Sequence, residues 1–425
     1  MKEDFINYIW SNKLYDFNGL SVSGTGEKIK LIEAGSRNTD SGPDFFNARI
    51  KIGNTIWAGN VEIHVKSSDW LAHRHHKDEA YDNIILHVVY TDDKPVFRKN
   101  GERIPTVELR DKIDIKILDR YNSFIKSKAW IACENQIASI DRFTVFAWLE
   151  ALCIERLEDK ANSIREKLKD NKQDFSEIFY RQLGRNFGFN TNSDAFELLT
   201  KSLPFSLVGK HMDRIDQLEA LFFGQAGLLK GPLKDNYPQS LYREYLFLQK
   251  KYDLVPVETK LWRFMRMRPS NFPTTRISQF VHLLHSVSGM LNKILEHDNL
   301  NELYALFDVQ ANAYWQDHSY FDSPSKPKST RLGQASIDIL LINTIIPFTF
   351  IYGKIFNEEN IQNKALIWYE QIKPERNKIT NGFTSLGLII DNAKHSQAVI
   401  QLKKNYCDKK RCLRCRFGHV LISGS

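Results

Sequence analysis

The chain has 425 residues, of which 42% are hydrophobic and 26% are charged. These values are ordinary for a globular protein with a sizeable core, and the length allows about two to three domains. The net charge of +8 is compatible with a polyanionic partner but does not require one.

The sequence lacks the marks of secretion and of a membrane span. The first ten residues, MKEDFINYIW, have neither the basic flank nor the long apolar core of a signal peptide. The most apolar stretch, 337–353, is interrupted by Asp338, Asn343, Thr344 and Pro347, so we expect buried helices there. The five cysteines are an odd, sparse set, which is typical of a reducing compartment. We therefore expect a cytoplasmic protein without membrane association.

The first 110 residues mix helix and strand patterns. Residues 4–15 place apolar side chains at helical spacing. Four strands follow, and Gly53-Asn54 between the second and the third is a two-residue hairpin signal. The predicted strands span 29–35, 44–52, 55–66 and 83–90, and a further hairpin around Asn100-Gly101 spans 95–110.

A polar helix is predicted for 70–81, between the third strand and the fourth, with Asp69 at its N-cap. The resulting order is helix, strand, strand, strand, helix, strand. This αβββαβ order resembles the core of the restriction-endonuclease-like, or PD-(D/E)xK, nuclease superfamily. The resemblance implies a sheet that carries a metal-dependent nuclease site.

The candidate site lies on the predicted strand 55–66, where Glu62, His64 and Lys66 share one face because side chains alternate along a strand. The superfamily pattern has Pro-Asp at the start of one strand, then an acid, one spacer and a lysine on the next. Asp44, which follows a proline, and Glu62 fit this pattern, but His64 stands at the lysine position. We expect Asp44 and Glu62 to hold Mg²⁺ or Mn²⁺, and Lys66, or His64 in its place, to orient the attacking water.

The register of the hairpin decides whether this site can form. A two-residue turn at 53–54 places Asp44 opposite Ile63, on the apolar face and away from Glu62. A one-residue bulge corrects this, and Gly59 is where a bulge is most readily tolerated. Without a bulge, the sequence describes a half-buried hairpin with a solvated front.

Five of the twelve histidines fall close together, and Glu33 and Asp40 are further acids that could complete a coordination shell. A histidine-rich zinc site is therefore an alternative to the carboxylate site. His73 and His76, three residues apart, are more typical of a polar helix face, and His87 of a hydrogen-bonded core histidine. The five histidines are His64, His73, His75, His76 and His87.

From about residue 140 the pattern changes to helices, with apolar residues at i, i+3, i+4 and i+7. There is no fixed repeat period, and 323–330 is the best candidate for a flexible loop. We therefore predict an α+β protein with a nuclease-like α/β domain at 1–125, a larger all-helical domain at 140–402 and a basic cysteine-bearing tail at 403–425.

A segment of the helical half, 261–276, interleaves arginines with aromatic residues. Such a segment can grip phosphates and stack bases. It is equally typical of a helix whose aromatic face is core and whose arginines are solvated. The candidate nucleic-acid-binding residues are Arg263, Arg266, Arg268 and Arg276 in this segment, with Lys409, Lys410 and Arg411 in the tail.

The tail has seven basic residues and one acid between 403 and 416, around cysteines spaced C-x4-C-x2-C. Thiolates at short spacing suit a tetrahedral metal, and basic neighbours would lower the pKa of the thiols. Cys407, Cys412 and Cys415 supply three ligands, and either His419 or the distant Cys133 supplies the fourth. We expect structural Zn²⁺ here. The alternatives are an iron–sulfur cluster, as the resemblance to iron–sulfur members of the nuclease superfamily implies, and a basic tail with free thiols.

Five motifs, taken together, resemble a bacterial family described only as a domain of unknown function. The resemblance spans nearly the whole chain and implies no activity. The motifs are GPDFFNA, WAGNVEIHVKSSDW, LFFGQAGLL, MRPSNFPTTR and YCDKKRCLRC.

These observations predict a metal-dependent nuclease, or a degenerate relative that binds nucleic acid. The helical half and the basic tail would grip the nucleic acid, so binding should weaken steeply with salt. The alternative is a non-enzymatic helical interaction or scaffold protein whose tail is stabilised by zinc. The two differ in whether a divalent metal binds at Asp44 and Glu62.

Overall fold

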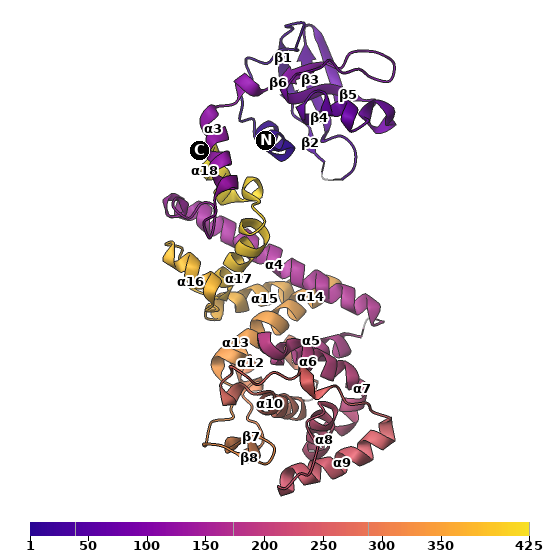
Figure 1. Ribbon diagram of the computed structural model, residues 1–425, viewed down its shortest axis with the longest axis vertical. Helices are drawn as coiled ribbons and strands as arrows, with labels where there is room; N and C mark the ends of the chain where they lie inside the picture. Colours follow the sequence, from indigo (N-terminus) through magenta and orange to yellow (C-terminus); the bar gives the residue numbers. More distant parts are fainter. Residues whose placement is uncertain (39, 173, 288, 425) are drawn as a thin grey trace. The chain divides into compact units, whose positions relative to one another are not determined.

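The computed structural model describes residues 1–38, 40–172, 174–287 and 289–424. Its architecture is mixed α+β, with a sheet in the N-terminal part and a larger helical part after it, as the sequence predicts (Figure 1). Two compact units result, Met1–Trp148 with Leu402–Ser425 and Leu149–Gln401. The cysteine-bearing tail therefore belongs to the same unit as the sheet.

The first unit is built on one mixed sheet whose strands run in the order β1, β3, β4, β5, β6, with the short β2 beside β3. β3 pairs antiparallel with β1 and β4, and β5 pairs parallel with β4 and β6. The strands are β1 Ile29–Glu33, β2 Ser36–Arg37, β3 Phe45–Ile52, β4 Thr55–Lys66, β5 Ile84–Thr91 and β6 Thr106–Glu108. The predicted strands follow these bounds closely, and β6 lies within the hairpin predicted for 95–110, in which Phe97 pairs with Arg103. Only β2 is an addition among the described strands of this sheet, and the nuclease resemblance stays a prediction.

Helices at both ends of the chain pack on this sheet. Helix α1 (Glu3–Ser11) contacts β4, and α18 (Arg416–Ser423) lies beside α3 (Ile115–Lys126) in Figure 1. Ile422, near the C-terminus, is fully buried in the apolar core that the sheet, α1 and α3 share. The tail is therefore an integral part of the first unit.

The hairpin between β3 and β4 has the predicted turn at 53–54, but its register shifts further along. Ala48 pairs with Gly59, whereas Phe45 pairs with Val61. Three steps along β3 thus match two steps along β4, so β3 carries one extra residue.

The extra residue lies beside Asn47, which adopts a left-handed φ of 59°. The bulge that the predicted site requires is therefore present, but it is in β3, and Gly59 lies opposite it. Because of the shift, Asp44 comes to lie opposite Glu62 and on the same face.

At Gly59, β4 runs close to β5 and to the residue before it. A Cβ there would lie 2.5 Å from Cγ2 of Ile85 and 2.6 Å from the carbonyl oxygen of Asn83. We expect Gly59→Ala to lower the free energy of unfolding by about 1–3 kcal/mol, as overpacking does. Urea unfolding measures this, with Gly209→Ala, where a Cβ meets no atom within 4 Å, as the control. Equal stability of the two variants would contradict the close approach.

The polar helix predicted for 70–81 is wrong in its extent. Helix α2 spans only Asp69–Ala72, with Ser68 rather than Asp69 at its N-cap, and Arg74 adopts a left-handed φ of 64°. Two 3₁₀ turns, η1 and η2, follow at His75–Lys77 and Glu79–Tyr81. Contacts between the histidines and the sheet override helix propensity here.

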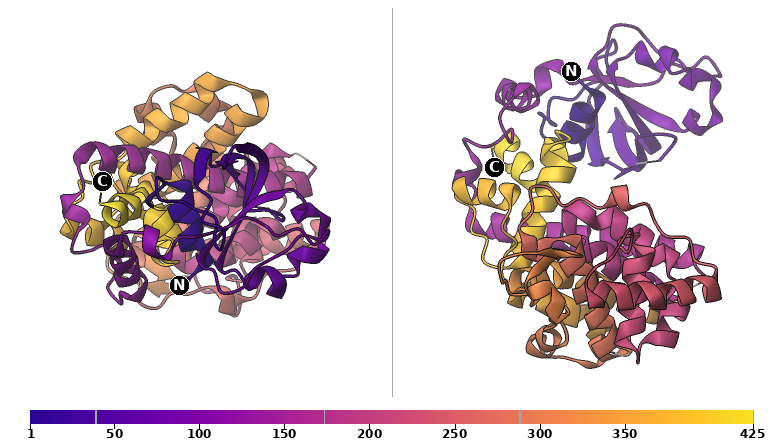
Figure 2. Two further views of the ribbon diagram at one scale, coloured as in Figure 1. Left: turned by 90° about the horizontal axis from the view of Figure 1, so that it is seen from above. Right: turned by 60° about the horizontal axis from the view of Figure 1, so that its bottom comes forward.

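The second unit is helical, as predicted, and Figure 2 shows its helices clustered and joined mostly by short loops. Helix α4 (Arg142–Asp170) begins in the first unit and continues into the second. The other helices are α5 Phe175–Phe187, α6 Phe189–Ser202, α7 Phe205–Val208, α8 Ile215–Gln225, α9 Asn236–Tyr252, α10 Pro273–Ser286, α11 Met290–Glu296, α12 Leu300–Leu306, α13 Gln334–Leu340, α14 Ile346–Phe356, α15 Glu359–Gln371, α16 Lys378–Ser385 and α17 Ala393–Gln401. A short hairpin, β7 with β8, spans His318–Tyr320 and Ser323–Pro324.

One helical stretch in the described part of the chain, Gln334–Phe356, is long and apolar enough to cross a membrane. Within its most apolar window, 67% is buried inside the protein. This is the stretch in which the sequence predicts buried helices.

Candidate metal centre

Asp44 and Glu62 face each other across the paired ends of β3 and β4. The main-chain N–H of Asp44 donates to Glu62 Oε2 at 3.1 Å, and the N–H of Ile63 donates to Asp44 Oδ2 at 3.0 Å. Glu62 is 5% exposed. The front of the hairpin is therefore buried, not solvated, and the bulge in β3 places both predicted carboxylates in it.

A third acid, Glu3 from helix α1, comes to the same place. Burial raises the pKa of Glu62 to about 9 and that of Glu3 to about 7, and in both cases the charge on Asp44 adds to the effect. Burial likewise raises the pKa of Asp44 to about 6. These three neighbouring carboxylates, of which Glu62 is buried and the other two are half-buried, repel one another and form a region in which a cation would be stabilised.

Three histidines complete the group. His64 Nε2 lies 3.1 Å from His73 Nδ1 and 3.7 Å from Glu62 Oε1, while His75 Nε2 lies 3.4 Å from the same Glu62 oxygen. One ligand atom from each of the three histidines lies within 4.8 Å of the others. Atoms bound at about 2.0–2.2 Å to one ion lie about 3–3.6 Å apart, so this spacing is close to that of a coordination shell.

His87 on β5 holds His64 in place. His64 Nδ1 lies 2.8 Å from Nε2 of His87, which is fully buried, so the second nitrogen of His64 is left for the centre. This agrees with His87 as a hydrogen-bonded core histidine. Burial lowers the pKa of His64 to about 2, of His75 to about 4 and of His87 to about 3. All three rings are therefore neutral near pH 7, which is the state that binds metal ions.

Some predicted residues lie outside the centre. Lys66 is exposed at the end of β4, and the described residues show no hydrogen bond or ion pair from its amine to the carboxylates. Glu33 pairs with Arg49 at 3.5 Å instead, and Asp40 is exposed in its loop. The amine expected beside the acids is thus absent from them, and His64 takes that place.

The sequence analysis did not predict two of the residues that lie in the candidate metal centre. Glu3 belongs to a helix that carries no motif, and its carboxylate Oε1 lies 3.9 Å from His64 Nε2 only because α1 packs on β4. The assignment of His73 to a polar helix face is wrong, because the chain turns back at Arg74. The close run of histidines at 73–76 was the available signal.

These groups make the stability of the metal-free protein depend on pH in two ways. With the pKa of Glu62 raised from 4.5 to about 9 and that of Glu3 from 4.5 to about 7, the folded chain holds protons that the unfolded chain has lost. The contribution of Glu3 to stability therefore falls between about pH 4.5 and 7, and that of Glu62 between about pH 4.5 and 9. The pKa of His64 is lowered from 6.5 to about 2, so between these pH values the ring is protonated in the unfolded chain but not in the folded one. The contribution of His64 to stability therefore falls as the pH is lowered from about 6.5 to about 2.

Above about pH 6.5 the histidines no longer change protonation in either state, so we expect the metal-free protein to lose stability from about pH 6.5 to 9. Bound metal should remove that loss, because metal ligands must be deprotonated. Thermal unfolding with a chelator and with saturating Zn²⁺ or Mn²⁺, at about pH 5.5, 7 and 9, measures both effects. A metal-free protein that becomes steadily more stable up to pH 9 would contradict this arrangement of acids.

A family model described as protein of unknown function (DUF2851) matches residues 3–378. The chain belongs to this family. The match contains every residue of the metal centre and ends before the cysteines of the tail. Neither the curated proteins nor the solved structures gave a match.

The DUF2851 chain brings four cysteines together in its first unit. Lys410 Nζ donates to the carbonyl oxygen of Ser127 at 2.7 Å, and the amine of Lys403 lies 5.3 Å from the centroid of the Trp130 ring. These contacts hold the segment before Cys133 against the tail. The four are Cys133, Cys407, Cys412 and Cys415; burial raises the pKa of each thiol, and neighbouring thiols raise it further at Cys133, Cys407 and Cys415.

Of the two candidates for the fourth ligand, Cys133 is the one whose thiol interacts electrostatically with the thiols of the tail. The Nδ1 of His419 lies 2.9 Å from the hydroxyl of Tyr8 on α1. The predicted lowering of the thiol pKa values is wrong: burial raises the pKa of Cys133 to about 12 and that of Cys415 to about 11. Burial is the largest cause at each thiol, and it outweighs the lowering of the pKa by Lys403 at Cys407 and by Lys410 at Cys412.

The arginine-rich segment of this DUF2851 chain has 3₁₀ turns but no α-helix before Pro273, where α10 begins. Asn192 anchors it by accepting from the N–H of Arg263 at 2.8 Å and donating to its carbonyl at 3.0 Å. Arg266 and Arg268 are exposed, whereas Arg276 is buried. In the tail, Lys409, Lys410 and Arg411 are all exposed.

Proposed function

We propose that the first unit is a divalent-metal-dependent phosphodiesterase acting on nucleic acid, with the metal held by Glu62, His64, His73 and His75. One observation carries the proposal: ligand atoms from two separate segments meet at distances of 3.1–3.7 Å around the buried side chains of Glu62 and His64, with two further acids beside them. The positive net charge of +8 favours a polyanionic substrate.

The donor set narrows the choice of metal. Imidazole nitrogens suit zinc and iron, whereas carboxylates and water suit magnesium and manganese. A site that combines three imidazoles with Glu62 favours Zn²⁺ or Mn²⁺ over the Mg²⁺ that carboxylates alone would favour. When bound, such an ion polarises a phosphodiester and lowers the pKa of a bound water.

The remaining residues have defined tasks in this proposal. His87 fixes the ring of His64 through the 2.8 Å contact between Nδ1 and Nε2. Asp44 accepts from the N–H of Ile63 at 3.0 Å and so stiffens the end of β4 beside Glu62. The side chain of Glu3 is 41% exposed, so its carboxylate is the acid placed to accept the proton of the attacking water from the solvent side.

Metal analysis and cleavage assays test the proposal. The purified chain is expected to bind Zn²⁺ or Mn²⁺ and to cleave a fluorescent single- or double-stranded oligonucleotide or bis(p-nitrophenyl) phosphate, and a chelator should stop the reaction. Metal binding without cleavage of any phosphodiester would make the centre structural and would contradict the proposed activity.

We also propose that the thiols of Cys133, Cys407, Cys412 and Cys415 hold a structural metal, as zinc or as an iron–sulfur cluster. The proposal is supported by two segments far apart in the sequence that place one buried and three half-buried cysteines near one another. Among the described residues, the group whose ligand atoms all lie within 4.8 Å of one another is that of the three histidines, not that of the cysteines. A single zinc ion would therefore require the four sulfurs to move closer together, whereas a larger iron–sulfur cluster would fit between more widely spaced sulfurs.

A further inference from the structure

A pocket of about 500 Å³ lies in the second unit, where the start of α6, the loop before α10, α10 itself and α13 meet. Among the described residues, three arginines line it and no aspartate or glutamate does. Asparagine and serine side chains and the rings of buried phenylalanines supply much of the remaining wall. The arginines are Arg266, Arg268 and Arg276.

Arg276 is 6% exposed and has only neutral partners. Its guanidinium donates to Gln279 Oε1 at 2.9 Å, Asn271 Oδ1 at 2.7 Å and Ser336 Oγ at 3.0 Å. It also lies 4.4 Å from the centroid of the Phe189 ring, and its Nε has no partner. Burial lowers the pKa of Arg276 to about 10, with no acid to counter it. A buried charge without a counter-ion is costly, and an anion in the pocket would remove that cost.

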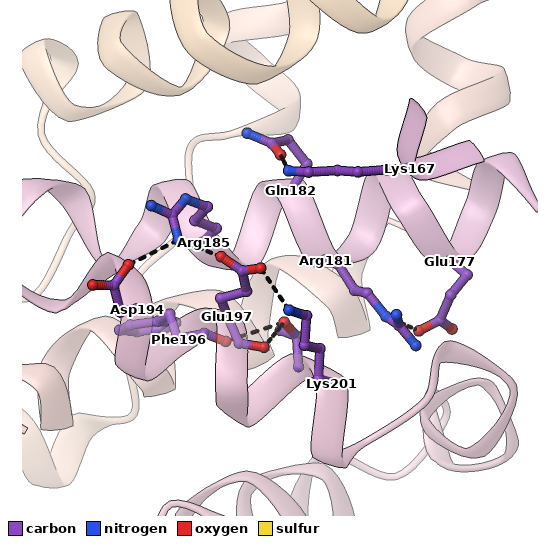
Figure 3. A network of polar contacts seen from close by, with 10 residues as sticks. Lys167, Glu177, Arg181, Gln182, Arg185, Asp194, Phe196, Glu197 and Lys201 are labelled. Atoms are coloured by element: carbon purple, nitrogen blue, oxygen red, sulfur yellow. Dashed lines mark hydrogen bonds and ion pairs between the residues drawn. The ribbon is translucent and has the colours of Figure 1, made fainter. Parts of the chain in front are cut away.

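The cations of another network in the same unit are paired with acids, unlike Arg276. Figure 3 shows Arg185 bonded to Asp194, at 2.9 Å, and to Glu197, which also pairs with Lys201 at 2.7 Å. Each of these cations is neutralised by an acid of the protein itself. Such a network is complete without a ligand, whereas the charge of Arg276 is not.

Hydrogen bonds and the start of a helix hold the wall of the pocket in place. Asn192, which is buried, clamps the backbone of Arg263 with two hydrogen bonds and so positions the loop that carries the exposed arginines. Helix α10 begins at the pocket wall with Pro273, and its N-cap residue Phe272 offers no side-chain acceptor. The positive end of α10 therefore adds to the field of the arginines.

We propose that this pocket binds the phosphate of a nucleotide, with Arg276 as a fixed guanidinium and Arg266 and Arg268 closing on the same group. Guanidinium groups pair with phosphate through two parallel hydrogen bonds, which suits a tetrahedral anion with several oxygens. The volume exceeds that of a phosphate ion and lies within the range of small-ligand sites. The inference stands apart from the metal centre, because all its residues belong to the other unit.

Calorimetric titration of the full chain with adenosine 5′-monophosphate, inorganic phosphate and adenosine tests the proposal. Adenosine monophosphate should bind more tightly than adenosine, and Arg276→Gln should weaken binding by about 10- to 100-fold. Arg268→Gln, at an exposed position that folding does not depend on, should weaken it in the same direction. Arg214→Gln, an exposed arginine outside the pocket, should not alter it.

A second titration shows whether the bound phosphate belongs to a nucleic-acid strand or to a free nucleotide. Oligonucleotides with a 5′-phosphate or a 5′-hydroxyl end distinguish a strand from a free nucleotide, and preference for either phosphorylated probe supports the proposal. It is overturned if no phosphorylated probe binds, if adenosine binds as well as its monophosphate, or if Arg276→Gln and Arg268→Gln both bind like the wild type. Arg276→Gln should remain folded without ligand, since it removes an unneutralised charge.

Discussion

Glu62→Gln should abolish metal-dependent cleavage while leaving the protein folded. Glu62 Oε1 lies 3.7 Å from His64 Nε2 and 3.4 Å from His75 Nε2, so it is the carboxylate shared by the proposed ligands. Altering a residue that merely orients a ligand costs about 10- to 100-fold in metal affinity or activity. Loss of a direct ligand should exceed that, so we expect cleavage to fall by more than about 100-fold.

In contrast to the cleavage rate, the stability of the metal-free Glu62→Gln variant should not fall. The amide oxygen of glutamine can still accept from the N–H of Asp44, as Glu62 Oε2 does at 3.1 Å. The variant also lacks a carboxylate whose pKa burial raises to about 9. Without metal, the variant should therefore match or exceed the wild type in stability at about pH 8, and it should gain little when metal is added.

Measurement of cleavage rate, metal content and unfolding temperature on the same preparations checks this. Glu33→Gln is the matched control, since Glu33 is an exposed acid on the same sheet, paired only with Arg49. The proposed roles fail if Glu62→Gln cleaves as fast as Glu33→Gln. They fail equally if its metal content and metal-induced stabilisation equal those of the wild type.

The sequence predicts the local parts of this site well. Alternation along 55–66 puts Glu62 and His64 on one face, and the turn at 53–54 pairs β3 with β4 as expected. Turn chemistry and strand period are short-range properties, so a single sequence specifies them. Counting residues along both strands from this turn also shows that a bulge is needed to bring Asp44 to the face of Glu62.

The parts that depend on tertiary packing could not be predicted. The bulge lies in β3 because Asn47 tolerates a left-handed backbone there, although Gly59 seemed the better position. Glu3 reaches His64 through the packing of α1, and Arg276 is buried by helices distant in sequence. The return of the tail to the first unit likewise has no signal in local pattern.

Cys133→Ser should release the metal of the tail and loosen the C-terminal segment. A thiolate-bound metal would join the chain near residue 133 to the chain near residue 412, closing a very long loop, and structural zinc contributes folding free energy outright. A loss of about 4 kcal/mol would lower the unfolding temperature of a unit of this size by on the order of 10 °C. Calorimetry and metal analysis measure the two effects, and visible absorption separates zinc from an iron–sulfur cluster.

His419→Asn is the informative control, because His419 is the ligand that sequence spacing alone could not distinguish from Cys133. The ring of His419 faces Tyr8 on α1 at 2.9 Å instead of the thiols, so this variant should keep its metal. Full metal content in Cys133→Ser, or loss of metal in His419→Asn but not in Cys133→Ser, would contradict the four-thiol site.

Loss of the tail metal should also lower cleavage, although no thiol lies in the metal centre. Helix α1 carries both Tyr8, which contacts His419, and Glu3, whose carboxylate reaches the centre. If the tail detaches, α1 loses that support, and Glu3 moves away from the position in which it would accept a proton. We therefore expect Cys133→Ser to retain the metal bound by His64 and its neighbours yet to cleave more slowly, with a pH–rate profile altered as in Glu3→Gln. An unchanged cleavage rate in a Cys133→Ser protein shown to have lost its tail metal would separate the two sites.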